Sequence, residues 1–261
     1  MEYIFDTHAH YDDEAFDPDR EELIAGLRNL GIGWVTNVAA SMESCKTTLA
    51  LAKKYPFFYA AVGVHPTETK DLTEEDMKWI QAASGDEKVR AIGEIGLDYY
   101  WDEPERELQK KWFVRQLKLA KEVRLPVIIH SRDAAQDTLE LMKAHHSGST
   151  GGVIHCLSYG TEIAREYLNM GYFLGVGGVV TYKNGRKLKE VVEYAPLSQI
   201  VLETDCPYLS PVPYRGKRNF SGNLPLVAEE IANIKGITAE EVIRETTKNA
   251  ARLYGLSLSE L

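Results

Sequence analysis

The chain opens with a motif of one aspartate and two histidines, FDTHAH, in which His8 and His10 stand two positions apart. If this segment is a strand, Asp6, His8 and His10 point to one face, because side chains alternate between the faces of a strand. Two imidazoles at this spacing can share one cation, or one can bind it while the other orients its neighbour. A lone His-x-His motif is equally typical of half-buried histidines at a strand end. Other motifs of the chain must therefore distinguish a metal site from such ordinary histidines.

More histidines and carboxylates stand near the C-terminal ends of other apolar segments: His65, Glu94, His130, His155 and Asp205. Imidazole and carboxylate together suit Zn²⁺, Mn²⁺, Ni²⁺ or Co²⁺, whereas Mg²⁺ prefers oxygen ligands. Even without His65, the six remaining residues exceed the ligand set of one open catalytic zinc ion, and two ions bridged by Glu94 would use them all. Such a pair can lower the pKa of a bound water and clamp both oxygens of a phosphodiester.

The elements that would position these residues alternate regularly along the chain. Strands are expected at 3–10, 34–40, 58–66, 89–99, 126–132, 151–158, 172–180 and 200–209. Helices are expected at 17–31, 41–56, 73–85, 103–124, 132–146, 160–171, 186–196 and 238–255. This alternation without a linker predicts a single domain over residues 1–261, a (β/α)8 TIM barrel with a metal site at the C-terminal mouth of its strands. A doubly wound sheet is the alternative, but no G-x-G-x-x-G follows the first strand.

Composition limits the classes of protein that the chain can represent. A net charge of −9 argues against a protein that coats nucleic acid electrostatically, although a few phosphates could still be held locally. No apolar run approaches the ~20 residues of a membrane span, and the N-terminal MEYIFD lacks the basic region of a secretory signal. Three dispersed cysteines favour a reducing cytoplasm, and we expect a monomer without an obligatory protein partner. We expect Cys156 and Cys206 to pack, and His145 and His146 to face solvent.

Six motifs, in order between residues 5 and 219, carry a family resemblance: FDTHAH, AVGVHP, AIGEIGLDYY, PVIIHSRDA, GGVIHC and LETDCPYLSPVPYRGKRN. The chain resembles the TatD family of metal-dependent deoxyribonucleases. The resemblance implies an exonuclease-like hydrolysis of DNA phosphodiesters by a metal-activated water. We expect single-stranded ends as the substrate, because an end or a loosened strand enters a concave barrel mouth more easily than a smooth duplex. It also implies the metal ligands that the strand-end argument selects: His8, His10, Glu94, His130, His155 and Asp205. We assign His8, His10, Glu94 and Asp205 to one ion, and Glu94, His130 and His155 to the other.

Two departures from the family pattern put the substrate preference in question. HCLSYG carries Leu157 and Tyr159 where the family has HCFSG, and Phe220 and Ser221 follow RGKRN in place of an acidic residue and a proline. We expect both departures to lie at the rim, where substrate could touch them.

Roles can be assigned to the remaining polar residues of the strand ends. Asp205 is the expected general base. Glu203, two residues earlier on the same strand face, is the alternative base or a partner that orients a histidine, and Asp6 is a second orienting candidate. His65 could contact a phosphate oxygen or merely cap its strand. Asp98 is expected to order its loop or bind substrate rather than metal.

The loop after the last predicted strand concentrates positive charge and aromatic residues. Phosphate contacts are expected from Arg215, Lys217 and Arg218. Unpaired bases could stack on four aromatic residues, or these could simply pack: Tyr99, Tyr100, Trp101 and Tyr214.

Two other functions are compatible with the same ligand set. An amidohydrolase or lactonase could use a binuclear site on a small molecule, but such barrels often carry a carboxylated lysine where this chain has Glu94. A metal-stabilised binding protein is disfavoured because structural metal sites are usually closed.

Overall fold

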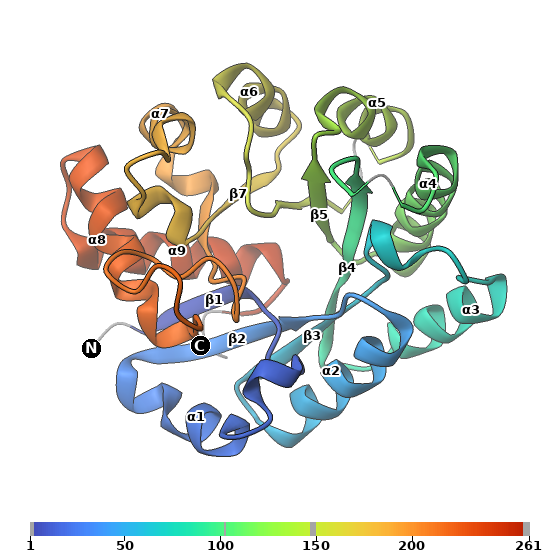
Figure 1. Cartoon of the computed structure of the whole chain (residues 1–261), viewed down its shortest axis with the longest axis horizontal. Coiled ribbons are helices and arrows are strands. Elements are labelled where there is room, and N and C mark those ends of the chain that lie inside the picture. Colours follow the sequence, from blue (N-terminus) through green and yellow to red (C-terminus); the bar gives the residue numbers. More distant parts are fainter. Residues whose placement is uncertain (1–2, 102, 147–149, 258–261) are drawn as a thin grey trace.

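Eight parallel strands form one sheet whose order follows the sequence from β1 to β8 (Figure 1). The strands are β1 (Ile4–Ala9), β2 (Ile32–Val38), β3 (Phe58–Val62), β4 (Val89–Asp98), β5 (Val127–Arg132), β6 (Gly152–Ile154), β7 (Phe173–Val176) and β8 (Ile200–Leu202). The structure, a computed structural model, describes residues 3–101, 103–146 and 150–257, so the ends of the predicted domain lie outside the described residues. The predicted TIM barrel is confirmed.

The barrel closes where the segment after β8 meets the end of β1. Ala9 and Cys206 form a parallel bridge. The Asp205 amide donates to the carbonyl of His8 at 2.9 Å, and the His10 amide donates to the carbonyl of Cys206 at 2.9 Å. The closing hydrogen bonds therefore run through residues that the sequence predicts as metal ligands or as their neighbours.

Nine α-helices surround the sheet in the described part of the chain. They are α1 (Arg20–Gly26), α2 (Met42–Lys54), α3 (Glu74–Ala83), α4 (Arg106–Val123), α5 (Ala135–His145), α6 (Thr161–Asn169), α7 (Arg186–Tyr194), α8 (Leu224–Lys235) and α9 (Ala239–Leu253). The first predicted helix, 17–31, is shorter than expected: α1 stops at Gly26, a poor helix former, and a 3₁₀ helix continues to Leu30. None of the helices described here combines the length and hydropathy that crossing a membrane requires.

Helix α8 was not predicted, although its pattern is readable. Its buried residues are Leu224, Val227, Ala228, Ile231 and Ala232, the spacing of one helical face. A proline in the first turn and Gly236 in the left-handed region after the last turn mark its two ends.

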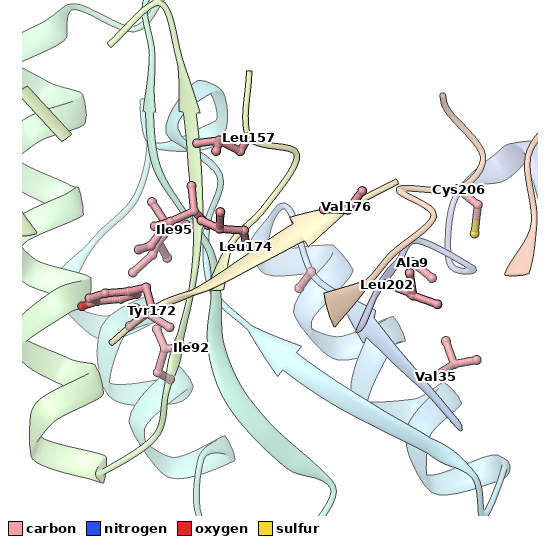
Figure 2. Packing of buried hydrophobic residues seen from close by; sticks show 14 of the residues in the cluster. Ala9, Val35, Ile92, Ile95, Leu157, Tyr172, Leu174, Val176, Leu202 and Cys206 are labelled. Atoms are coloured by element: carbon pink, nitrogen blue, oxygen red, sulfur yellow. The ribbon is translucent and has the colours of Figure 1, made fainter. Parts of the chain in front are cut away.

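Two apolar layers follow from the alternation of side chains along each strand. The outer layer lies between strands and helices and includes Leu174 and Val176 of β7 and Leu202 of β8 (Figure 2). The inner layer fills the barrel with their neighbours, among them Phe173 and Val201. Residues of α9 and the segment after it, such as Tyr254, belong to the inner layer, and the Tyr254 hydroxyl donates to the carbonyl of Thr7 at 2.6 Å.

The inner layer determines what lies at the mouth. Ile128 of β5 and Val153 of β6 point into the barrel. The next inward positions, two residues further along, are those of His130 and His155. The predicted ligands therefore stand directly above a closed apolar layer.

The departures from the family pattern are not where we expected them. Leu157 is buried in the outer apolar cluster (Figure 2), and Ser221 is buried between Asp6 and the hydroxyl of Tyr11. The half-buried Tyr159 accepts from the amide of Ala134 at 3.1 Å. Leu157 and Ser221 thus belong to the interior of the fold, and the prediction that they lie at the rim is wrong.

His146 also differs from the prediction, because it is buried rather than solvated, whereas His145 is half-buried. Its Nδ1 is hydrogen-bonded to the hydroxyl of Tyr172. Burial first, and then the charge of Lys121, lower the pKa of His146 to about 4. The sequence placed it at the polar end of a helix, but the start of β7 brings Tyr172 over it.

This burial predicts a pH dependence of stability. The unfolded chain binds a proton at His146 with an ordinary pKa of about 6.5, whereas the folded chain binds it only near 4, so stability falls as the pH drops from 6.5 towards 4. Between pH 7 and pH 5 the wild type should lose about 2 kcal/mol more unfolding free energy than His146→Gln. Urea unfolding of both proteins at the two pH values measures the difference, and equal losses would contradict the burial.

Candidate metal centre

A cavity of about 360 Å³ opens at the C-terminal ends of the strands. Its lining consists of His10, Asp12, Asp13, Ala40, Ser44, His65, Glu94, His130, His155, Asp205 and Tyr208. Five of the six predicted metal ligands are among these residues. The sixth, His8, is buried next to His10. None of the lining residues is lysine or arginine.

One group of ligand atoms forms where β1 meets β4 and β8. Nε2 of His8 lies 3.1 Å from Nε2 of His10 and 3.4 Å from Oε2 of Glu94. Nε2 of His10 lies 3.4 Å from Oδ1 of Asp205. Of the four residues that the sequence assigned to a first ion, His8, His10 and Glu94 form one close set of ligand atoms, whereas Asp205 forms a close set with His8 and His155.

The second group forms on the other side of Glu94. Its Oε1 lies 2.8 Å from Nδ1 of His130 and 3.7 Å from Nε2 of His155. The two carboxylate oxygens of Glu94 therefore face different histidines, Oε2 toward the β1 pair and Oε1 toward β5 and β6. Asp205 also approaches this group, with Oδ1 3.6 Å from Nε2 of His155.

Polar contacts of three histidines determine which ring nitrogen faces the centre. Nδ1 of His10 donates to the carbonyl of Val38 at 2.7 Å, because a carbonyl can only accept, and Nε2 is left for the cavity. Nε2 of His130 faces Oδ2 of Asp98 at 3.0 Å, and Nδ1 of His155 lies 3.2 Å from Oε2 of Glu203. Such carboxylates orient metal-binding histidines and raise their basicity.

Glu203 is held in its place by two further features. Its Oε1 accepts from the amide of Cys156 at 2.7 Å. A Cβ atom at Gly175 would lie 2.1 Å from Oε2, so the glycine on β7 leaves the room that the carboxylate occupies. The alternative that Glu203 orients a histidine fits these contacts.

Asp6 does not point with the two histidines, and that expectation is wrong. The pairing register of β1 with β2 shifts between Asp6 and Ala9, which breaks the strict alternation of side chains. The Asp6 carboxylate accepts from Thr204 Oγ1 at 2.7 Å and from Ser221 Oγ at 2.6 Å. It ties β1 to the segment after β8, and its contact with His8 is to the backbone amide, at 3.3 Å, rather than to the imidazole.

The electrostatics of the cluster fit a divalent cation. Burial alone would raise the pKa of Glu94, but His155, His8 and a hydrogen bond from His130 hold it well below its usual range. Against burial, Asp205 raises the pKa of His10 to about 9, and Glu203 and Asp205 raise that of His155 to about 10. The carboxylates thus hold positive charge on the imidazoles, which is the role that a bound cation would take over.

A buried nitrogen atom of His8 without a hydrogen-bond partner in the described part of the chain also supports a metal site. Nδ1 of His8 is buried without a hydrogen-bond partner among the described residues, while its Nε2 faces another imidazole nitrogen. A mixed set of imidazole and carboxylate ligands is typical of Zn²⁺, Mn²⁺, Ni²⁺ and Co²⁺. The residues therefore fit a metal centre.

The other predicted site residues lie at different distances from this centre. His65 lines the cavity, with Nε2 4.0 Å from Oε1 of Glu94 and Nδ1 2.7 Å from the hydroxyl of Thr67. Asp98 is buried against His130, and its Oδ1 accepts from the amide of Tyr100 at 3.0 Å. It orders its loop, one of the two roles expected for it, and also holds a ligand.

The three basic residues of the last loop do not act as a group. The Arg218 guanidinium donates to both carboxylate oxygens of Asp19, at 2.8 and 2.6 Å, so its charge is already paired. Arg215 stacks over the ring of Tyr182 at 4.3 Å, and the Lys217 ammonium lies 5.7 Å from the ring of Tyr214. None of the three lines the metal cavity.

Sequence reasoning missed four polar or aromatic residues that line the cavity: Asp12, Asp13, Ser44 and Tyr208. Asp12 accepts from the side-chain amide of Asn37 at 2.8 Å, and Asp13 accepts from the hydroxyl of Tyr208 at 2.9 Å. The only signal for Asp12 and Asp13 was their position just after the first predicted strand, and Ser44 and Tyr208 lay inside a predicted helix and a predicted strand.

Comparisons with known proteins find relatives that are named metal-dependent hydrolases. A family model described as TatD related DNase matches residues 5–255. YabD of Bacillus subtilis, an uncharacterized metal-dependent hydrolase, is 44% identical over 254 residues, 97% of this chain and 100% of the relative. YcfH of Escherichia coli, also an uncharacterized metal-dependent hydrolase, is 33% identical over 263 residues, 99% and 98% of the two chains. The crystal structure of YjjV, a TatD homologue from Escherichia coli, has a TM-score of 0.91 at 32% identity and covers 97% and 98%.

A TIM barrel with imidazole and carboxylate ligands at its mouth defines the class of metal-dependent hydrolases. Within that class, the chain belongs to the TatD family.

The central position of Glu94 predicts what its loss does. Glu94→Gln should reduce binding at both ligand groups, because each faces one of its oxygens. The metal content after dialysis against Zn²⁺ or Mn²⁺, measured by mass spectrometry, should fall by more than half of the wild-type value. Glu229→Gln, on the exposed face of α8, is the matched control and should leave it unchanged. Full metal content in Glu94→Gln would show that neither ligand group depends on the carboxylate that lies between them.

The space at Gly175 predicts a second effect. Gly175→Ala should displace the Glu203 carboxylate and lower metal affinity about 10- to 100-fold, the usual cost of losing a carboxylate that orients a ligand. Competition with a chromogenic chelator measures the affinity, and circular dichroism checks the fold. Gly26→Ala is the control, because a Cβ there meets no atom within 4 Å. Equal affinities in the two variants would show that Glu203 does not depend on this space.

Proposed function

We propose that the protein hydrolyses phosphodiester bonds of DNA with two divalent metal ions, and that single-stranded ends are its preferred substrate. One observation carries the proposal: the two oxygens of Glu94 face two separate groups of ligand atoms in an open cavity. Bound ions would acidify a water molecule and neutralise the charge of the phosphate. Zn²⁺, Mn²⁺, Mg²⁺, Ni²⁺ and Co²⁺ remain candidates, and imidazole ligands favour the metals other than Mg²⁺.

The exposure and contacts of the polar side chains at the site distinguish their proposed roles. Asp205 is the proposed general base, because its side chain is 18% exposed and its Oδ1 faces both ligand groups. Glu203 is 1% exposed, its Oε1 accepts from the amide of Cys156, and its Oε2 lies 3.2 Å from Nδ1 of His155, so we assign it the orientation of His155. Burial lowers the pKa of His65 to about 3, and its Nε2 faces the cavity, where a neutral imidazole could donate to a phosphate oxygen.

DNA is favoured as the substrate on two grounds. The matching family model is described as TatD related DNase. The rim presents exposed aromatic side chains, which unpaired bases can stack on, among them Tyr100, Trp101 and Tyr208. A concave mouth admits an end or a single strand more easily than a smooth duplex. The cytoplasmic location expected from the three cysteines, all unpaired here, stays a prediction.

Substitution of the proposed base tests the function. Metal-loaded wild type should shorten end-labelled single-stranded oligonucleotides, and chelation should stop the reaction. At saturating metal, Asp205→Asn should lower kcat about 10²- to 10⁴-fold, because an amide cannot take up the proton. Glu203→Gln should lose less at saturating metal, since it acts through His155.

Two outcomes would revise this assignment. A larger kcat loss in Glu203→Gln than in Asp205→Asn would exchange their roles. Hydrolysis of amides or lactones, but of no phosphodiester, by the wild type would overturn the proposed function in favour of the small-molecule alternative.

A further inference from the structure

Exposed aromatic side chains gather on two loops of the mouth. Of the eight large apolar side chains that are exposed in the described residues, two follow β4 and three follow β8. Tyr100 and Trp101 are 56% and 64% exposed, and their rings meet edge to face at 5.1 Å. Tyr208 and Tyr214, in the loop after β8, are 54% and 43% exposed. We call the first pair the β4 platform and the second pair the β8 platform.

The two platforms lie on opposite sides of the metal cavity. The strand order runs from β1 to β8 and closes between β8 and β1, so β4 and β8 are four positions apart in a ring of eight. Figure 1 shows the helices that follow them, α4 and α8, on opposite sides of the barrel. A chain that touches both platforms must pass over the ligand cluster.

Each platform is anchored to a residue of the centre. The amides of Tyr100 and Trp101 donate to Oδ1 of Asp98, at 3.0 and 3.3 Å, while Oδ2 of Asp98 holds His130. The amide of Tyr208 donates to the carbonyl of Asp205 at 2.9 Å. The platforms are therefore fixed relative to the ligands, even though their rings are exposed.

Positively charged side chains lie next to the β8 platform, on the side that faces the β7–α7 loop, and they favour binding of a polyanion there. Arg215 donates to the side chain of Asn184 in the neighbouring β7–α7 loop at 3.5 Å, and Lys183 in that loop is exposed. Lys217 lies beside Tyr214. On the other side, the segment 12–22 carries seven acidic residues and one arginine. A phosphate backbone that leaves the β8 platform would turn toward β7 and away from this acidic segment.

We infer that a single-stranded polynucleotide crosses the mouth from the β4 platform to the β8 platform, with its bases stacked on both and its phosphates led toward Arg215, Lys217 and Lys183. This rests on the proposed function and specifies its substrate path. An oligonucleotide too short to reach both platforms uses only one of them, so binding should strengthen with length until both are occupied. Base stacking suits this role because every base has a π face, so the path is not specific for sequence.

Length dependence tests the path. For oligothymidylates of two to twelve nucleotides, kcat/KM of the wild type relative to bis(4-nitrophenyl) phosphate should rise and then level off. Trp101→Ala and Tyr208→Ala should each lower the ratio for the longest substrate about 5- to 150-fold, mainly through KM. Tyr194→Ala is the matched control, because Tyr194 is 51% exposed but lies at the C-terminal end of α7, away from the mouth. The same loss in Tyr194→Ala, or none in the platform variants, would overturn the path.

Binding can be followed without turnover. Trp101 is the most exposed of the four tryptophans, so acrylamide quenching of its fluorescence should fall when a phosphorothioate dT12 is bound. The combined change Lys183→Gln, Arg215→Gln and Lys217→Gln should reduce the slope of log affinity against log salt by about 2. Lys248→Gln, exposed on α9, should not change it. If the protein cleaves phosphodiesters but Trp101 is quenched equally with and without the oligonucleotide, the substrate path is wrong and the proposed function stands. If it neither cleaves phosphodiesters nor shows reduced quenching of Trp101, both the path and the proposed function are wrong.

Discussion

The structure of the mouth depends on keeping the Glu94 carboxylate ionised while it is 4% exposed. An isolated buried carboxylate would cost several kcal/mol and would take up a proton instead. His8, His130 and His155 surround Glu94 at 2.8–3.7 Å and lower its pKa against the effect of burial. Since no lysine or arginine among the described residues lines the cavity, the compensating charge must come from protonated imidazoles or from bound metal ions.

The residues that surround the ionised Glu94 are positioned by the same backbone segments that close the barrel. The amides of Asp205 and His10 form the hydrogen bonds that join the segment after β8 to β1. The side chains of both residues point into the ligand cluster. Barrel closure and ligand geometry are therefore not independent, because a shift in the register of β1 against β8 would separate the His8–His10 pair from Asp205.

Much of this site follows from the sequence, because His130 and His155 lie two residues beyond inward apolar positions on regular strands. Asp6 was mispredicted because the register shift inside β1 does not show in the alternation of residue types. The burial of His146 and Leu157 depends on elements that only the fold brings over them. Arg218 was grouped with its basic neighbours, since its partner Asp19 is 199 positions away.

The acidic character of the protein constrains how it could act on the proposed anionic substrate. The chain carries a net charge of −9, and its cavity is lined by carboxylates, including Asp12 and Asp13. A phosphodiester would meet repulsion there unless divalent cations were bound first. Because linkage is reciprocal, cations that raise the affinity for the diester are themselves held more tightly in its presence. The net charge of the whole chain therefore says little about the proposed substrate, whereas the charges of the groups around Glu94 determine whether an anion can enter.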